Sequence, residues 1–180
     1  MKKFTFATIL VALIVSIALF SSAESAHPMW THTVDGFSFK LPAGWLDTTG
    51  KVDGLECHYF YGNIFDPYSS FMYVYAQSVV MPVSQDYVEY FYDAALINMQ
   101  IINAKHMTID IGGEKAYLWS GYRTLNDDTS HDLYGVMLYH DQRLLICRYI
   151  ADKTAREDAA AFVEAFAASI TVEDIDDTWY

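Results

Sequence analysis

The chain has 180 residues, enough for one domain with a substantial core, and its 23 acidic against 11 basic side chains give a formal net charge of −12 at pH 7. This balance disfavours binding to nucleic acids and to anionic membrane surfaces, because both are negatively charged. The simplest interpretation is a charge that keeps a protein soluble outside the cell. Binding of cations or of a basic partner is the alternative.

The first residues have the pattern of a secretory signal peptide. Lys2 and Lys3 precede an apolar run from Phe4 to Phe20, and small residues follow up to Ala23. We therefore expect cleavage after Ala23, a signal peptide over residues 1–23 and a secreted, periplasmic or cell-envelope location, with no membrane span left in the mature chain. A retained anchor is the alternative, since the apolar run approaches the length that spans a bilayer.

Strand patterns dominate the next part of the chain. Asp35-Gly36 separates two short extended runs, 31–34 and 37–41, and this dipeptide predicts a hairpin. The polar stretch 50–54 is expected to be a turn. Strands are predicted over 55–61 and 70–80, which are rich in aromatic and β-branched residues.

Two amphipathic helices are predicted around a four-strand meander. The first helix follows Ser84, which suits an N-cap, and has an apolar stripe from Val88 to Ile102. The second begins at a capping box formed by Thr154 and Glu157. Between the helices, strands are expected over 107–111, 116–125, 133–139 and 144–150, and the last two are apolar on both faces, as in central strands that are covered from both sides.

This element order predicts an α+β domain over residues 24–172, followed by an acidic tail at 173–180. The expected architecture is a three-layer α/β/α sandwich with a mainly antiparallel sheet and two principal helices. A half-polar strand at 107–111 would lie near the edge of that sheet.

The sequence resembles the PsbP-like fold group in its opening segment Asp35 to Trp45, in the turn and strand from Ile111 to Tyr117, and in the closing hairpin with its Phe-rich helix. That group includes the photosystem II extrinsic protein, the Ran-binding Mog protein and many small bacterial envelope proteins. The resemblance implies the sandwich fold and a non-enzymatic binding or accessory role. It implies no particular ligand or partner site.

The sequence lacks several motifs that are typical of common enzyme classes. The six histidines include no zinc-protease pair, and there is no Gly-x-Ser-x-Gly elbow, phosphate-binding glycine loop or Cys-x-x-Cys pair. Cys57 and His58 are adjacent on a predicted strand and point to opposite faces, so they cannot form a nucleophile and base pair. We expect no cofactor and favour a non-catalytic domain; a carboxylate- or metal-assisted hydrolase is the alternative.

The oxygen-rich loop 126–132 is the candidate site for that alternative. Asp127, Asp128 and Asp132 have the oxygens that a divalent cation needs, but the loop lacks the alternating spacing and the glycine of a helix-loop-helix calcium site. A solvated turn is favoured, and a divalent-cation-binding protein remains an open interpretation.

Aromatic residues are concentrated in the middle of the chain. Tyrosine combines a flat apolar ring with a polar tip, which suits the surface of a sugar or of a protein. The candidate binding residues for a glycan or an unknown envelope protein are Tyr59, Tyr61, Tyr68, Tyr73 and Tyr75. The alternative is that these rings only pack beneath a helix.

The two cysteines, Cys57 and Cys147, both fall in predicted strands. An extracellular compartment permits a disulfide between them, provided that their strands are close and their side chains point the same way. Two buried thiols acting as small apolar side chains are the other possibility.

Overall fold

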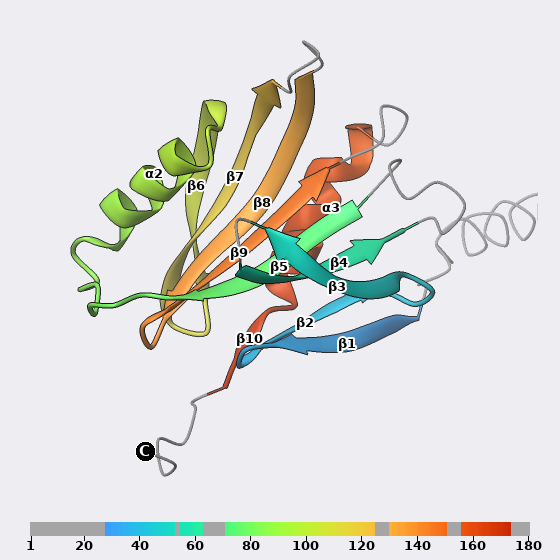
Figure 1. Ribbon diagram of the computed structural model, residues 1–180, viewed down its shortest axis with the longest axis horizontal. Helices are drawn as coiled ribbons and strands as arrows, with labels where there is room; N and C mark the ends of the chain where they lie inside the picture. The colour runs from blue at the N-terminus through green and yellow to red at the C-terminus, as the bar shows by residue number, and fades with distance from the viewer. Residues whose placement is uncertain (1–27, 53–54, 63–70, 125–129, 151–155, 174–180) are drawn as a thin grey trace, which may run out of the picture.

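A seven-stranded antiparallel sheet forms the centre of the molecule in the computed structural model, which describes residues 28–52, 55–62, 71–124, 130–150 and 156–173 (Figure 1). The strands follow the order β3-β4-β5-β9-β8-β7-β6. Their bounds are β3 (Leu46–Val52), β4 (Leu55–Tyr61), β5 (Phe71–Ser78), β6 (Ile102–Ile111), β7 (Glu114–Thr124), β8 (Ser130–His140) and β9 (Arg143–Ile150). β9 therefore lies between β5 and β8, which joins the two halves of the sheet.

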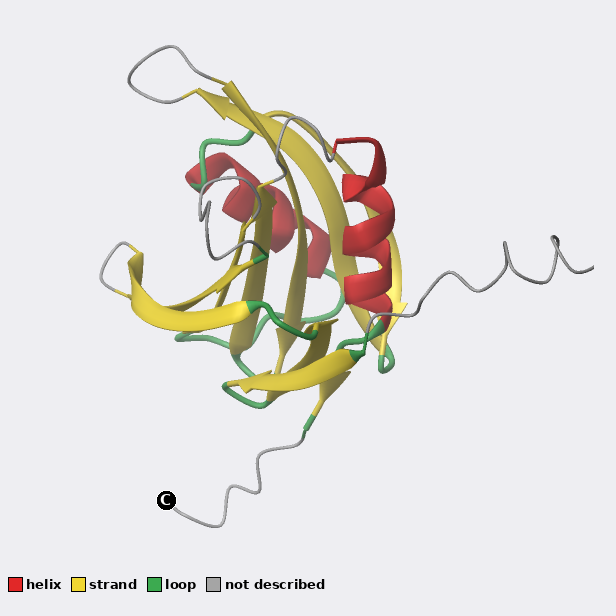
Figure 2. Cartoon of the chain, turned by 90° about the vertical axis from the view of Figure 1, so that its right-hand side faces the viewer, coloured by secondary structure: helices red, strands yellow, loops and turns green. Residues whose placement is uncertain are grey.

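The two helices lie on opposite faces of this sheet, as Figure 2 shows. α2 (Val88–Asn98) packs its buried side chains into one apolar core with Tyr117, Trp119 and Met137. α3 (Arg156–Ala168) packs into a second core with Val136 and Leu138. Successive residues of a strand point to opposite faces, so β8 contributes to both cores. The predicted three-layer sandwich is confirmed.

A smaller sheet covers part of the α3 side. It contains β1 (Met29–Val34), β2 (Phe37–Pro42) and β10 (Thr171–Val172), in the order β1-β2-β10. Asp35 and Gly36 turn the chain with φ angles of 51° and 82°, so the predicted hairpin is confirmed. Phe39 of β2 is fully buried, and its ring centroid lies 5.2 Å from that of Phe166 on α3.

Several predicted boundaries are wrong. The polar segment expected to turn at 50–54 continues β3 as far as Val52, because β3 pairs with β4 along its length and this pairing overrides a weak local preference. α2 begins at Val88 rather than after Ser84, and Tyr87 at its N-cap makes no side-chain capping bond. Ile102 belongs to the edge strand β6 instead of the helix stripe, since the chain leaves the helix at Gln100, where φ is 57°.

Other features agree with the sequence or lie beyond the described residues. β6 is an edge strand, as its half-polar pattern predicted. Thr154 of the expected capping box, and the acidic tail from residue 174 onward, fall outside the described residues. Within the described ranges, no helix has the length and apolar character needed to cross a membrane.

Candidate functional site

α2 covers only one half of its face of the sheet. Its ring contacts are with β7 and β8: the Tyr92 and Tyr117 centroids are 4.9 Å apart, and those of Phe91 and Tyr139 are 5.9 Å apart. Figure 1 shows α2 beside β6, β7 and β8, with β3, β4 and β5 at the other side of the sheet. The half formed by β3 to β5 has no helix of its own among the described elements.

Four aromatic side chains lie together on this uncovered half, and we call them the tyrosine face: Tyr59 and Tyr61 of β4, and Phe71 and Tyr73 of β5. The Tyr59 and Tyr73 centroids are 5.0 Å apart, and those of Phe71 and Tyr73 are 4.9 Å apart, both with edge-on geometry. All four side chains are half-buried, so each ring keeps part of its surface accessible. They share one face because residues two apart on a strand point the same way.

The tyrosine candidates from the sequence are thus largely brought together. Tyr59, Tyr61 and Tyr73 belong to the tyrosine face, and Tyr75 follows on the same side of β5 but is only 6% exposed. Tyr68 lies outside the described residues.

A lateral row of residues continues from the tyrosine face across the sheet. Tyr59 is opposite Tyr73, Tyr73 is opposite Arg148 of β9, and Arg148 is opposite Gly135 of β8. The next position is Trp119 of β7, whose ring carbon Cε2 lies 2.6 Å from the place where a Cβ on residue 135 would stand. The absence of a side chain at Gly135 therefore lets the indole ring close the row beside Arg148.

A cavity of about 710 Å³ lies between α2 and strands β5 and β9. Its lining includes Tyr75, Gln77, Asn98, Ile146 and two arginines, Arg123 and Arg148. These arginines are the only charged side chains among the described residues that line it. The cavity therefore has a positive character in a chain whose net charge is −12.

Arg148 is 8% exposed and lacks a charged partner among the described residues. Its Nη2 donates a hydrogen bond to Tyr75 Oη at 3.3 Å, and its Nε is buried without an acceptor. The sequence analysis did not select this residue. The sequence does contain a feature that could identify it, because Arg148 is the only charged side chain within the apolar run 144–150.

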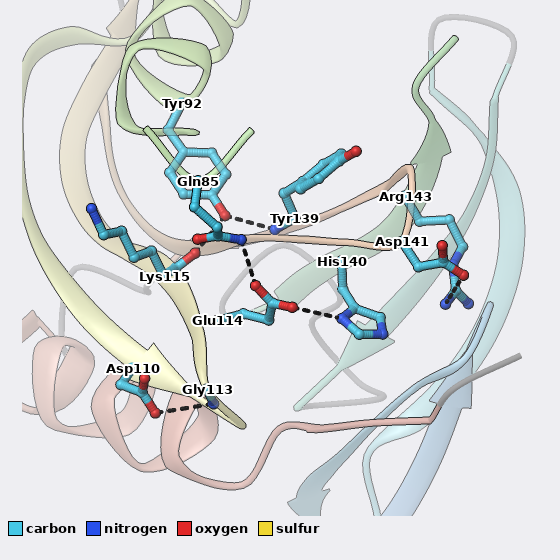
Figure 3. A network of polar contacts seen from close by, with 10 residues as sticks. All are labelled: Gln85, Tyr92, Asp110, Gly113, Glu114, Lys115, Tyr139, His140, Asp141 and Arg143. Atoms are coloured by element: carbon cyan, nitrogen blue, oxygen red, sulfur yellow. Dashed lines mark hydrogen bonds and ion pairs between the residues drawn. The ribbon is translucent and has the colours of Figure 1, made fainter. Parts of the chain in front are cut away.

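Arg143, the other buried arginine of β9, has structural partners. Its Nη1 donates to the Asp35 carbonyl oxygen at 2.7 Å, and its guanidinium carbon lies 5.3 Å from the centroid of the Phe37 ring. Its Nη2 is 3.9 Å from the Asp141 carboxylate, as Figure 3 shows. Arg143 thus holds the β8–β9 turn against the β1–β2 turn.

The rest of the network in Figure 3 ties adjacent turns and α2 together. Glu114 at the start of β7 accepts from Gln85 at 2.6 Å and lies 3.2 Å from His140 Nδ1. Tyr92 of α2 donates to the Lys115 carbonyl at 2.7 Å and accepts from the Tyr139 backbone N–H at 2.6 Å. These contacts join neighbouring elements, and we assign them a structural role.

The two cysteines are free thiols in different cores. Cys57 packs with Tyr75 on the α2 side, whereas Cys147 packs with Val74 on the α3 side, with strand β5 between them. The disulfide that the sequence left open is therefore absent. Burial raises the pKa of Cys57 to about 11 and raises the pKa of Cys147 well above its ordinary value, so neither thiol is activated as a nucleophile.

The candidate metal loop gains no structural description. Asp127 and Asp128, and the side chain of Asp132, fall outside the described residues, so a cation site there stays a prediction. Among the residues that the structure does describe, no three or more His, Cys, Asp or Glu side chains are grouped so as to hold a metal ion.

No protein-family model matches the sequence, and no curated protein matches it. Solved structures are similar in fold. Cyanobacterial PsbP (CyanoP) from Synechocystis sp. PCC 6803 has a TM-score of 0.58 at 14% identity, over 84% of this chain and 96% of that chain. LpqN of Mycobacterium tuberculosis, which is involved in cell envelope biogenesis, has a TM-score of 0.56 at 11% identity, over 82% of this chain and 91% of its own.

The chain therefore has the PsbP-like fold, as its opening and closing segments predicted. Sequence identities this low show the fold alone.

Proposed function

We propose that this protein is a secreted, non-catalytic binding domain of the cell envelope and that it recognises a glycan through the tyrosine face. The observation that carries the proposal is the contact cluster of Tyr59, Tyr61, Phe71 and Tyr73 on the half of the sheet that α2 leaves uncovered. Stacked and edge-on rings present flat apolar surfaces with hydroxyl groups at their tips, and sugar rings bind such surfaces through both features.

The expected signal peptide over residues 1–23 supports an extracellular location for this binding domain. The similarity in fold to LpqN, a protein involved in cell envelope biogenesis, is consistent with that location. The absence of the searched catalytic motifs from the sequence supports a role in binding. Mass spectrometry of the exported protein tests whether the signal peptide is removed, and we expect a mature chain that begins at Glu24.

Isothermal titration of the full-length chain against soluble oligosaccharides tests the binding role. Chitotetraose and cellotetraose serve as neutral probes, and peptidoglycan fragments serve as an envelope probe. We expect the double variant Tyr59→Ala/Tyr73→Ala to lose about tenfold or more in affinity, because stacking area is removed from the centre of the face.

Tyr87 and Tyr90 provide a matched control. Both side chains are exposed, at 68% and 77%, and neither belongs to the tyrosine face. The variant Tyr87→Ala/Tyr90→Ala removes the same atoms from another surface and should bind as well as the natural protein. Equal losses in the two double variants, or a hydrolytic turnover that one point substitution abolishes, would contradict the proposal.

A further inference from the structure

Arg148 is an anomaly in the core of this protein. A buried charge destabilises a fold unless an opposite charge and hydrogen bonds compensate it. Arg143, five positions earlier on the same strand, has a carbonyl, a carboxylate and an aromatic ring around it. Among the described residues, Arg148 has one hydrogen bond, of 3.3 Å to a neutral hydroxyl, and no carboxylate beside it. Its Nε is buried without an acceptor, as are Nε and Nη2 of Arg143, so the two arginines differ in their carbonyl and carboxylate neighbours.

The surroundings of Arg148 favour an anion from outside the chain. The cavity that it lines holds a second cation, Arg123, and no described acidic side chain. Its other polar lining residues include the amides of Gln77, Asn98 and Gln100, which donate hydrogen bonds without adding negative charge. Among the described lining residues, this cavity therefore has two positive charges and no negative charge, although the chain has 23 acidic residues.

The geometry also links this cavity to the tyrosine face. Arg148 is directly opposite Tyr73 in the strand register, and Tyr73 is in ring contact with Tyr59. A sugar ring that stacks on these tyrosines therefore lies one strand away from the guanidinium. The hydroxyl of Tyr75, which accepts from Arg148, keeps its own proton free to donate to a bound oxyanion.

We propose that the cavity beside α2 binds the carboxylate or phosphate group of an acidic glycan, with Arg148 as the counter-ion and Arg123 as a second cation. The inference rests on the proposed function and specifies its ligand class. A planar guanidinium pairs with a carboxylate or a phosphate through two parallel N–H bonds, and Arg148 lines the cavity. The cavity volume of about 710 Å³ is in the range of small-ligand sites.

Calorimetric titration of the full-length chain with matched charged and neutral sugars tests the inference. In fully methyl-esterified tetragalacturonate, each carboxylate of tetragalacturonate is replaced by a neutral methyl ester, and glucose lacks the phosphate group of glucose 1-phosphate. We expect at least one charged sugar to bind about tenfold or more tightly than its neutral counterpart at low salt, and the preference to shrink as salt rises.

Substitutions identify the residues that cause the preference for the charged sugar. Arg148→Met should abolish it while retaining the weaker binding of the neutral sugar, and Arg123→Gln should reduce it. Lys105→Gln is the control, because Lys105 lines a separate cavity bounded by Ala160, Val163 and Glu164 of α3. A thermal melt of each variant verifies folding, and Arg148→Met should melt at or above the natural protein, because an unpaired buried charge is removed.

The outcomes separate the inference from the proposed function. Equal binding of charged and neutral sugars, or a preference that survives in Arg148→Met, overturns the anion site and leaves the glycan-binding role intact. Inorganic phosphate that binds the natural protein but not Arg148→Met, with no sugar bound, supports the anion site and overturns the glycan role. If Arg148→Met fails to fold, Arg148 has a structural role and the test passes to Arg123→Gln. An unchanged preference of Arg123→Gln for the charged sugar overturns the anion site, and a reduced preference supports it.

Discussion

The two faces of the central sheet are used differently. On the α3 side, a helix and the small β1-β2-β10 sheet bury the core, and the buried arginine that reaches the β1–β2 turn, Arg143, has its partners there. On the α2 side, the helix covers one half, the tyrosine face lies on the other, and Arg148 has no charged partner among the residues that the structure describes. Among the described elements, one face is thus covered by a helix and a second sheet, whereas the other is covered by a helix over one half and keeps the half-buried tyrosine face on the other half.

The largest expected difference concerns large apolar side chains. Phe166→Ala on α3 empties a fully packed position on the closed face and should lower the free energy of unfolding by about 3–5 kcal/mol. Tyr73→Ala on the half-buried tyrosine face should cost about 1 kcal/mol, because part of that side chain is already in contact with water. Urea denaturation followed by circular dichroism measures both, and similar losses would erase the contrast between the faces.

Arg143 and Arg148 lie on the same strand, β9, and allow the stability of the two faces to be compared there. Arg143→Met removes the hydrogen bond to the Asp35 carbonyl and the contact with the Phe37 ring, so we expect a loss of roughly 2 kcal/mol. Arg148→Met should change stability little or increase it. The same denaturation curves test this, and a larger loss for Arg148→Met than for Arg143→Met would reverse the assignment of roles.

Alkaline pH should destabilise the fold through the buried tyrosines between α2 and the sheet. Burial raises the pKa of Tyr117 to about 12, and burial also raises the pKa of Tyr92. In the unfolded chain these phenols ionise near pH 10, so between about pH 10 and 12 the folded state binds more protons than the unfolded state. Stability is therefore complete below about pH 10 and falls as pH rises toward 12.

Thermal melts between pH 8 and 12 measure this decline, and Tyr92→Phe provides the control. That variant lacks one of the two phenols and should show a shallower decline. It should also be less stable at pH 8, since the Lys115 carbonyl and the Tyr139 N–H lose their partner. A slope unchanged by Tyr92→Phe would exclude Tyr92 from the effect.

The smallest expected effect is chemical labelling of the cysteines. Cys57 and Cys147 belong to the cores on opposite sides of the sheet, and both are buried. Iodoacetamide should label neither thiol in the native protein, and it should label both in denaturant without any reductant. A mass that shows no added label after denaturation would mean that a disulfide joins them.

Local patterns predicted much of this fold. The hairpin at Asp35-Gly36, the edge position of β6 and the buried character of β8 and β9 all follow from short-range chemistry. The turn expected at 50–54 was placed too early, because residues 50–52 still belong to β3, a polar strand that is held by its pairing with β4. Short-range patterns carry no information about such pairing between separate segments.

The candidate site was predictable only in part. The tyrosines stand out by composition, and residues two apart on a strand, such as Tyr73 and Tyr75, share one face. The role proposed for Arg148 depends on the structure, which places Tyr73 on one side of it and Gly135 on the other, with no acidic side chain among the described residues that line the cavity. A lone charge in an apolar strand run is the signal to use, but the sequence does not say whether a partner meets it.

The insertion of β9 between β5 and β8 has a consequence for the time at which the protein can act. The row from Tyr59 to Trp119 is continuous only through Arg148, which is contributed by the last of the seven strands to be synthesised. A chain still emerging from a ribosome or a translocation channel has the tyrosines but not the strand that connects them to the arginine. The proposed recognition of a charged sugar would thus begin only after β9 has closed the sheet.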